Sequence, residues 1–390
     1  MAVMDIEPGG ATGRCYVSAL SQHPDSSQAA AEVTAPVLEQ LGRMPELAVF
    51  FVTPQHRDAV DDIADVVRSV LQPVTLLGAA AVAVLGPRRE VEATPAVSLL
   101  AARLGSPPVP VRLEAERTGQ GWQISGFPTD VAGTRSLLLV ADPFTFPADA
   151  LLDDLARIQP GLAVVGGMAS AANTPGDNRL LVDDSSSTGG AVGALLAEDV
   201  SPQAVVSQGC RPIGRPYIVT RAEGHMIHEL GGRPALERLL TTLERLPPGD
   251  RHLAEQGLHC GVVIDETKDQ FARGDFLIRG VLGIDRATGA VAVGDTPAVG
   301  STVQFQVRDA ASADEDLHAL LTGRAARGAL VFTCNGRGRR LFGTPDHDAI
   351  VVGDLLGTTA VAGMFCAGEL GPVGGRNAVH GYTASIAIFP

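Results

Sequence analysis

The chain has 390 residues, of which 45% are hydrophobic and 19% are charged. This balance excludes a long disordered chain, and the length is enough for two domains. Thirty Lys and Arg residues against forty-four Asp and Glu residues give a net charge of −14. A field of this sign repels nucleic acid and anionic lipid, so we expect neither nucleic-acid nor membrane partners.

The cysteines and the start of the chain indicate a cellular compartment. The five cysteines are widely separated and form no C-x-x-C pair, which argues against a disulfide framework and a zinc knuckle. The opening MAVMDIEPGG has neither a basic region nor an apolar core, and no apolar run approaches the length of a membrane span. We therefore expect a soluble, cytoplasmic protein.

Three stretches of the chain share one pattern, at residues 46–102, 137–196 and 329–389. Each has an apolar strand, an amphipathic helix, a second strand that runs into small residues, and a closing apolar strand. From the first strand to the glycine of the small-residue segment the distance is 27 residues in two copies and 31 in the third. The sequence therefore predicts an α/β fold in which mixed sheets, flanked by helices, are built from repeated β-α-β-β units.

Between the second and third copies the sequence changes character. Pro212, Gly214 and Pro216 interrupt regular structure, a helix is expected at 231–246, and residues 257–308 alternate apolar runs with turns in the manner of strands. We predict a two-domain chain. Its parts are a partly mobile segment at residues 1–34, an N-terminal domain at 35–210, a linker at 211–223 and a C-terminal domain at 224–390.

Several motifs occur together in the order found in one known family. They are QGCRPIG and GGRPALE near the predicted boundary, then FTCNGRG at 332–338 and GMFCAGELGP at 363–372. On these motifs the chain resembles the FIST domain proteins over nearly its whole length. The resemblance implies a FIST N-terminal domain at 35–210 and a FIST C-terminal domain at 224–390, in a bacterial protein of the stand-alone type.

The resemblance also implies a function. FIST proteins are expected to be cytoplasmic sensory modules of signal transduction that bind small ligands, with amino acids or related metabolites as the expected class. A signalling protein is the expected partner. No reaction and no cofactor is implied, so we favour a binding protein over an enzyme.

The candidate binding residues follow the first two strands of the third copy. Arg337 offers a planar fork for a carboxylate, Asn335 can donate and accept, and Glu369 suits an ammonium group. Phe365 would form an apolar wall, and together these side chains would read a zwitterion such as an amino acid. The alternative is that Arg337 and Glu369 pair with each other in a structural ion pair. The predicted ligand-binding residues are Cys334, Asn335, Arg337, Phe365, Cys366, Gly368 and Glu369.

Two alternatives from other functional classes remain open. Cys334 or Cys366 would be the nucleophile of a cysteine-dependent enzyme, with His347 or His380 as base, although no local spacing supports the pairing. Buried free cysteines commonly serve as small apolar side chains, so we predict no catalytic residue. The other alternative is a ligand-independent scaffold for protein interactions.

Metal and nucleotide sites are not expected. The cluster of His225, His228 and Glu229 departs from H-E-x-x-H, and the polar loop at 183–187 has the composition of an ordinary solvated loop. The Gly-rich segments match neither a phosphate-binding P-loop nor a dinucleotide fold, and they are explained by tight turns and close strand packing.

Overall fold

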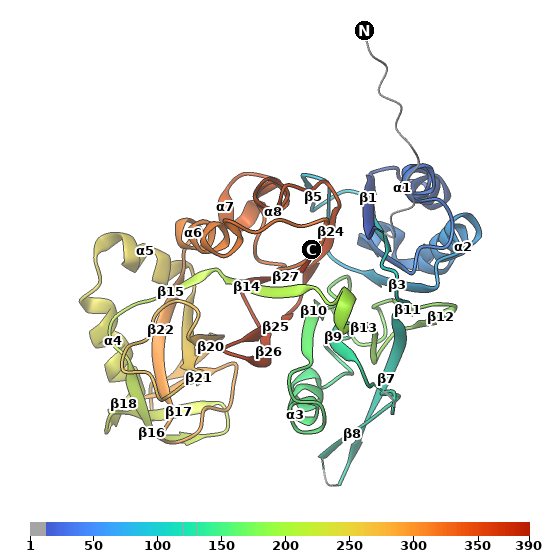
Figure 1. The fold of residues 1–390 in the computed structure, drawn as a ribbon. Coiled ribbons are helices and arrows are strands. Elements are labelled where there is room, and N and C mark those ends of the chain that lie inside the picture. The colour runs from blue at the N-terminus through green and yellow to red at the C-terminus, as the bar shows by residue number, and fades with distance from the viewer. Residues whose placement is uncertain (1–12, 120, 130) are drawn as a thin grey trace.

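The computed structural model describes residues 13–119, 121–129 and 131–390. Its strands form four sheets, three of which belong to three units of the same topology (Figure 1). The fourth sheet belongs to a region inserted into the third unit. In the described part of the chain, no helix is long and apolar enough to cross a membrane.

The first unit spans residues 15–103. Its elements are β1 (Cys15–Ser21), α1 (Ser26–Leu41), β2 (Leu47–Val52), the 3-10 helix η1 (Pro54–Ala59), α2 (Val60–Leu71), β3 (Thr75–Ala80), β4 (Val84–Gly86), β5 (Arg89–Val91) and β6 (Val97–Arg103). The sheet order is β1-β6-β2-β3, with β2 and β3 parallel. All six residues of β2 are buried, and Ile63, Val67 and Leu71 of α2 pack in the same core as one of its faces.

The second unit spans residues 109–197. Its elements are β7 (Val109–Thr118), β8 (Gly121–Ser125), β9 (Thr134–Ala141), α3 (Ala148–Ile158), β10 (Ala163–Met168), β11 (Leu180–Val182), β12 (Ser185–Ser187) and β13 (Ala191–Ala197), followed by the 3-10 helix η2 (Glu198–Val200). The order β7-β13-β9-β10 repeats that of the first unit, again with the two central strands parallel.

The third unit combines residues 203–208 with residues 310–389. Its elements are β14 (Gln203–Gln208), α6 (Ala310–Leu321), β23 (Gly328–Cys334), α7 (Arg339–Phe342), α8 (His347–Leu356), β24 (Val361–Cys366), β25 (Glu369–Val373), β26 (Arg376–His380) and β27 (Thr383–Phe389). The order β14-β27-β23-β24 is the same once more, with β23 parallel to β24. The repeated unit predicted from the sequence is thereby confirmed.

Each unit has a hairpin that pairs with the sheet of another unit. The hairpin β4–β5 of the first unit pairs with β24 of the third, β11–β12 of the second pairs with β3 of the first, and β25–β26 of the third pairs with β10 of the second. The three exchanges close a ring, so the units form one structure, which we call the three-unit body.

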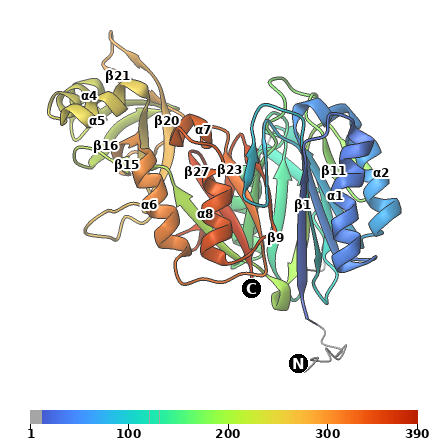
Figure 2. The ribbon, with the colours of Figure 1, turned by 90° about the horizontal axis from the view of Figure 1, so that it is seen from above.

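The centre of the three-unit body is a shared apolar core. Phe51 of the first unit meets Phe332 of the third edge to face, with ring centroids 5.9 Å apart. Ser170 of the second unit joins the other two, because its Oγ donates to the Phe365 carbonyl at 2.5 Å and accepts from the Val82 amide at 2.9 Å. Figure 2 shows that helices α1 and α2, and likewise α6 and α8, cover the outer faces of their sheets.

The inserted region, residues 210–308, lies beside the three-unit body (Figure 1). Its elements are β15 (Cys210–Pro212), β16 (Tyr217–Glu223), β17 (Met226–Leu230), β18 (Arg233–Pro234), α4 (Ala235–Glu244), α5 (Pro248–Gln256), β19 (Leu258–Val263), β20 (Phe276–Asp285), β21 (Ala290–Val293) and β22 (Thr302–Arg308). Residues 257–308 are strand-rich as predicted, and the expected helix at 231–246 is α4, which begins directly after Pro234.

The predicted division into domains stays a prediction. Residues 211–223, predicted as a linker, include all of β16. Of the predicted mobile segment 1–34, residues 1–12 lie outside the described part of the chain, whereas residues 15–21 form β1 and residue 26 begins α1.

Candidate functional site

Polar side chains gather at the carboxyl ends of the parallel strands β23 and β24. This is the edge of an open α/β sheet where ligand sites are usually found. In this chain the edge faces the inserted region, because β14 leads directly into β15 and β22 leads back into α6. The site is therefore built from the third unit, with the inserted region beside it.

Arg337, in the loop after β23, is held by Asp348. Arg337 Nε donates to Asp348 Oδ2 at 2.8 Å and Nη2 donates to Oδ1 at 2.9 Å, and neither side chain is exposed. The guanidinium also lies 5.2 Å from the ring centroid of Phe342. Burial acts to raise the pKa of Asp348, but the charge and hydrogen bonds of Arg337 hold it well below its usual range. The alternative of an Arg337–Glu369 ion pair is thus wrong, because the first turn of α8 brings Asp348 onto the guanidinium fork.

Glu369, at the start of β25, has a different set of partners. Its Oε2 accepts from the backbone amide of Thr383 at 3.0 Å and from the Thr383 hydroxyl at 2.8 Å. The side chain is completely buried, and this burial raises its pKa to about 8 even though the Thr383 bonds and the charge of Arg337 favour the ionised form. At neutral pH, Glu369 is consequently held mainly as the neutral acid.

Four buried atoms in and beside this site lack a hydrogen-bond partner among the described residues. They are Nη1 of Arg337 and Oε1 of Glu369 in the third unit, and Nε of Arg308 and Nδ1 of His259 in the inserted region. The backbone passes close to the first of them, since a Cβ atom on Gly209 would lie 3.4 Å from Arg337 Nη1. Buried polar atoms are almost always paired, so these unpaired atoms mark the place where a ligand could supply the missing hydrogen bonds.

The two cysteines of the predicted site lie side by side. Cys334 and Cys366 are register partners at the ends of β23 and β24, and both are buried. The Gly336 amide donates to Cys334 Sγ at 3.4 Å. Burial, with the nearby carboxyl of Glu369, raises the pKa of Cys334 to about 12 and also raises that of Cys366.

The remaining three predicted residues have other surroundings. Asn335 is exposed, and its backbone N–H donates to the Cys366 carbonyl at 2.8 Å. Phe365 packs in the core beneath α8, on the opposite face of β24 from Cys366. The Gly368 carbonyl accepts from the Met168 amide at 2.7 Å and so joins the second unit. The structure thus gathers Cys334, Arg337, Cys366 and Glu369, and it places Phe365 elsewhere.

Several residues at this site were missed by sequence reasoning. Arg308 of β22 donates to the Gly336 carbonyl and lies 5.4 Å from the ring centroid of Tyr382. The ring of His259 also contacts Tyr382, at 4.2 Å between centroids. Nothing in the sequence signals these contacts across the inserted region. Asp348 carries a weak signal, since an acidic residue in the first turn of a helix is favoured by the helix dipole.

The histidines considered as catalytic bases are engaged in other bonds. His347 contacts Asp348 Oδ1 at 3.0 Å and Asp314 Oδ1 at 2.9 Å. His380 contacts the Gly371 carbonyl through Nε2 at 2.9 Å, and its burial lowers its pKa to about 4. Neither bond reaches a cysteine, so this geometry does not activate a thiol.

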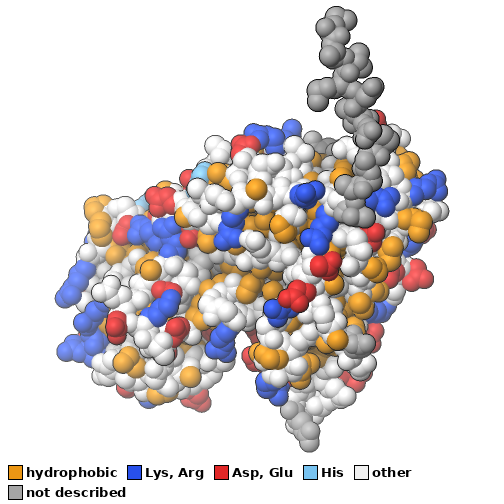
Figure 3. All heavy atoms as spheres, viewed as in Figure 1, with side chains coloured by type: hydrophobic (Ala, Val, Ile, Leu, Met, Phe, Trp, Pro, Cys, Tyr) orange, Lys and Arg blue, Asp and Glu red, His pale blue; other side chains and the backbone are white. Residues whose placement is uncertain are grey.

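A cleft of about 190 Å³ lies at the seam between the inserted region and the three-unit body. Its walls come from α3, from β19 and β20, and from the hairpin β25–β26, and its charged groups include Asp149, Arg279 and Arg376. Figure 3 shows a notch at the lower edge of the molecule between the inserted region and the second unit. Arg279 spans the seam, because it pairs with Asp295 at 2.9 Å and donates to the Val379 carbonyl at 3.1 Å.

Comparison with known proteins assigns the chain to a family. A sequence model of the FIST N domain matches residues 46–233, and a model of the FIST C domain matches residues 235–372. This chain belongs to the FIST family. The two matches of this FIST protein meet between β18 and α4, within the inserted region.

Relatives of this FIST protein occur in mycobacteria. An uncharacterized protein of Mycobacterium tuberculosis (strain ATCC 25618 / H37Rv) is 46% identical over 379 residues, which cover 95% of this chain and 98% of the relative. An uncharacterized protein of Mycobacterium bovis (strain ATCC BAA-935 / AF2122/97) is 46% identical over 374 residues, covering 94% and 96%. FIST domains are associated with sensory roles in signal transduction.

Proposed function

We propose that this FIST protein senses a small zwitterionic ligand, an amino acid or a related metabolite, at the carboxyl ends of β23 and β24. One observation carries the proposal: Arg337 Nη1 and Glu369 Oε1 are both buried and both lack a hydrogen-bond partner among the described residues. An unpaired buried polar atom costs about 1–3 kcal/mol. A ligand that pairs both atoms would recover this cost on binding.

The chemistry of the two atoms selects the class of ligand. Arg337 Nη1 is a cationic donor, so it calls for a carboxylate or another acceptor on the ligand. Glu369 Oε1 can accept from an ammonium group, whose charge would draw the Glu369 proton off at neutral pH and strengthen the contact. A molecule with both groups fits these two atoms better than a simple acid or a simple amine.

Entry of the ligand requires the inserted region to move, because Arg337 and Glu369 are fully buried. The contacts of Arg308 and His259 with the Tyr382 ring would have to open for this movement, and the cleft at the seam gives a place where the boundary is not closely packed. In this proposal the ligand stabilises one position of the inserted region, and a signalling protein reads that position. A cytoplasmic, bacterial setting is supported by the five free cysteines and by the mycobacterial relatives.

The proposal is tested by thermal unfolding in the presence of a panel of amino acids, small carboxylic acids and small amines. A ligand that binds the folded chain raises the melting temperature by mass action. Glu369→Gln keeps the shape of the side chain but cannot ionise to pair with an ammonium group, so it should abolish the rise in melting temperature. Glu116→Gln, on the exposed surface of β7, is the matched control and should retain the shift.

The same assay decides between this site and the cleft. If the ligand still raises the melting temperature of Glu369→Gln but not that of Asp149→Asn or Arg376→Ala, the ligand binds in the cleft. This result would overturn the proposed site. If no member of the panel changes the melting temperature, while a partner protein binds equally well with and without the panel, the scaffold alternative stands and the sensor proposal fails.

A further inference from the structure

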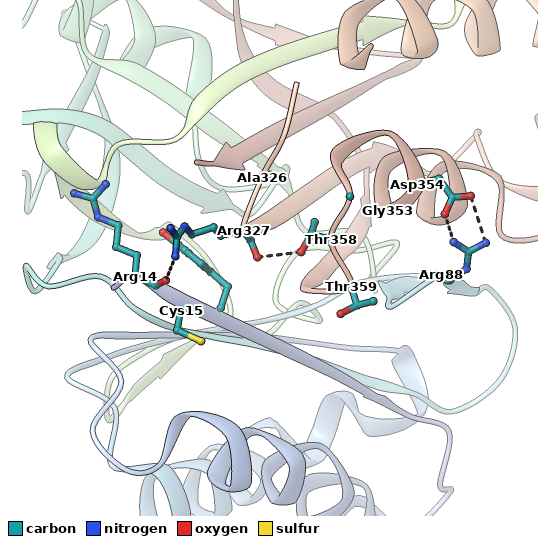
Figure 4. Close-up of a pocket in the computed structure, with 11 residues that line it drawn as sticks. Arg14, Cys15, Arg88, Ala326, Arg327, Gly353, Asp354, Thr358 and Thr359 are labelled. Atoms are coloured by element: carbon teal, nitrogen blue, oxygen red, sulfur yellow. Dashed lines mark hydrogen bonds and ion pairs between the residues drawn. The ribbon is translucent and has the colours of Figure 1, made fainter. Parts of the chain in front are cut away.

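A second and larger cavity, of about 580 Å³, lies between the first and third units (Figure 4). Its volume is within the range of small-molecule sites. The first unit contributes Arg14 and Tyr16 of the β1 end and Arg88 of the β4–β5 turn, and the third unit contributes Arg327 and Thr358. None of these residues takes part in the strand-end site.

The lining of this cavity is cationic in a chain whose net charge is −14. It contains three arginines and one acidic residue, Asp354, which pairs with Arg88. Arg14 Nη2 lies 3.5 Å from Asp199 Oδ2, a long and partly exposed contact. Arg14 Nε also donates to the Leu104 carbonyl at 3.4 Å. Arg327 makes no ion pair with any carboxylate in the described ranges, so its charge is the one at this end of the cavity that no carboxylate neutralises.

Hydrogen bonds fix the walls of this cationic end. Arg327 Nη1 donates to the Arg14 carbonyl at 2.9 Å, and the Thr358 hydroxyl donates to the Arg327 carbonyl at 3.0 Å. Figure 4 shows Arg14 and Arg327 at one end of the cavity, Arg88 with Asp354 at the other, and Thr358 between them. Burial raises the pKa of Tyr16 to about 12, while the charges of Arg14 and Arg327 act in the opposite direction.

We propose that this cavity binds a small phosphate ester, with the phosphate between Arg14 and Arg327. Two guanidinium groups at one end match the double charge and the planar oxygen pairs of a phosphate better than they match a single carboxylate. The volume greatly exceeds that of a bare phosphate ion, so the organic part of the ester occupies the space toward Arg88. This site is independent of the proposed sensor site, since the two share no residue.

Isothermal titration of the full chain at low ionic strength tests the site, with inorganic phosphate and adenosine monophosphate as the two probes. The ester should bind more tightly than inorganic phosphate, and raising the salt concentration should weaken both, because the contacts are charged and partly exposed. Equal affinities for the two probes, or no heat from either of them, would contradict the assignment to a phosphate ester.

Substitutions test whether Arg327 binds the phosphate ester. Arg327→Ala should weaken ester binding about tenfold or more, since it removes a charge-assisted donor. The control Arg324→Ala removes an exposed arginine three residues away that bonds Gln203 and the Leu320 carbonyl, and it should leave the affinity unchanged. Arg327→Lys, which keeps the charge but loses the fork, should bind with intermediate affinity. Equal affinity in the Arg327→Ala variant and the unmodified chain would overturn the proposal.

Discussion

Asp348 holds Arg337 through two parallel hydrogen bonds of 2.8 and 2.9 Å, although neither side chain is exposed to solvent. The pair links the loop after β23 to the first turn of α8, so it fixes the loop on which the proposed site is built. It also leaves a single guanidinium nitrogen, Nη1, for any ligand. Two guanidinium nitrogens of Arg337 therefore stabilise the fold, and only the third is available to bind a ligand.

Breaking this pair should destabilise the protein strongly. Arg337→Ala leaves the Asp348 carboxylate buried without the guanidinium, with only the Thr333 hydroxyl and His347 as side-chain partners, so we expect a loss of about 3–5 kcal/mol in the free energy of unfolding. Urea titration followed by circular dichroism measures it. Arg339→Ala, an exposed neighbour, should change stability by less than about 0.5 kcal/mol. The double variant Arg337→Leu/Asp348→Leu should lose less than the sum of the two single Leu variants; strictly additive losses would argue against the buried pair.

Glu369 should make stability depend on pH. Its pKa is 4.5 for the free side chain and about 8 in the folded protein, where burial disfavours the charge. Between these values the folded state binds more protons than the unfolded state, so stability falls as the pH rises from 4.5 to 8 and levels off above. The slope is at most about 1.4 kcal/mol per pH unit.

The Glu369 contribution is isolated by comparing the unmodified chain with Glu369→Gln in urea titrations from pH 5 to 9. Glu90, whose pKa burial also raises to about 8, acts with the same sign and remains in both proteins. The difference in stability between the two proteins should shift in favour of the variant as the pH rises. A difference independent of pH would show that Glu369 is already ionised in the folded state.

Cysteine labelling of the folded protein should modify the exposed Cys15 and leave the four buried cysteines unmodified. Cys15 is exposed, whereas Cys210, Cys260, Cys334 and Cys366 are buried. Burial raises the pKa of Cys210, Cys260 and Cys334 to about 12, so their thiolate fraction near neutral pH is negligible. Iodoacetamide at pH 7.5, with mass spectrometry of the peptides, should modify Cys15 alone until the protein is unfolded. Rapid modification of Cys334 or Cys366 in the folded chain would contradict this prediction and favour the alternative of a cysteine-dependent enzyme.

The glycine of β24 should not tolerate a side chain. A Cβ atom on Gly363 would collide with the Val331 carbonyl oxygen of the neighbouring strand, which is held in the sheet and cannot yield. Gly363→Ala should therefore cost about 1–3 kcal/mol of stability, measured by thermal or urea unfolding. Gly283→Ala in β20 meets nothing within 4 Å and is the control. If Gly363→Ala were as stable as the unmodified chain, close strand packing would not explain why residue 363 is glycine.

The repeated architecture could be predicted from sequence because its signals are local. An apolar run such as LAVFFV at 47–52 forms a buried strand whatever surrounds it, and the stripe of Ile63, Val67 and Leu71 predicts its own helix face. The break at Pro212, Gly214 and Pro216 predicts a linker between two domains; that the region after it is inserted into the third unit, between β14 and α6, was not predicted. The residues that would form the site were predicted in part, because Arg337 and Glu369 follow strands that the pattern locates.

Only the tertiary structure decided which groups meet. The exchange of hairpins among the three units joins residues such as Gly167 and Glu369, about two hundred positions apart, and no periodicity within either segment encodes that pairing. The partner of Arg337 is Asp348 and not Glu369 because the first turn of α8 packs against the loop after β23. Local apolar patterns specified the strands and helices of this chain, whereas the partners of its buried charges depend on which elements long-range packing brings together.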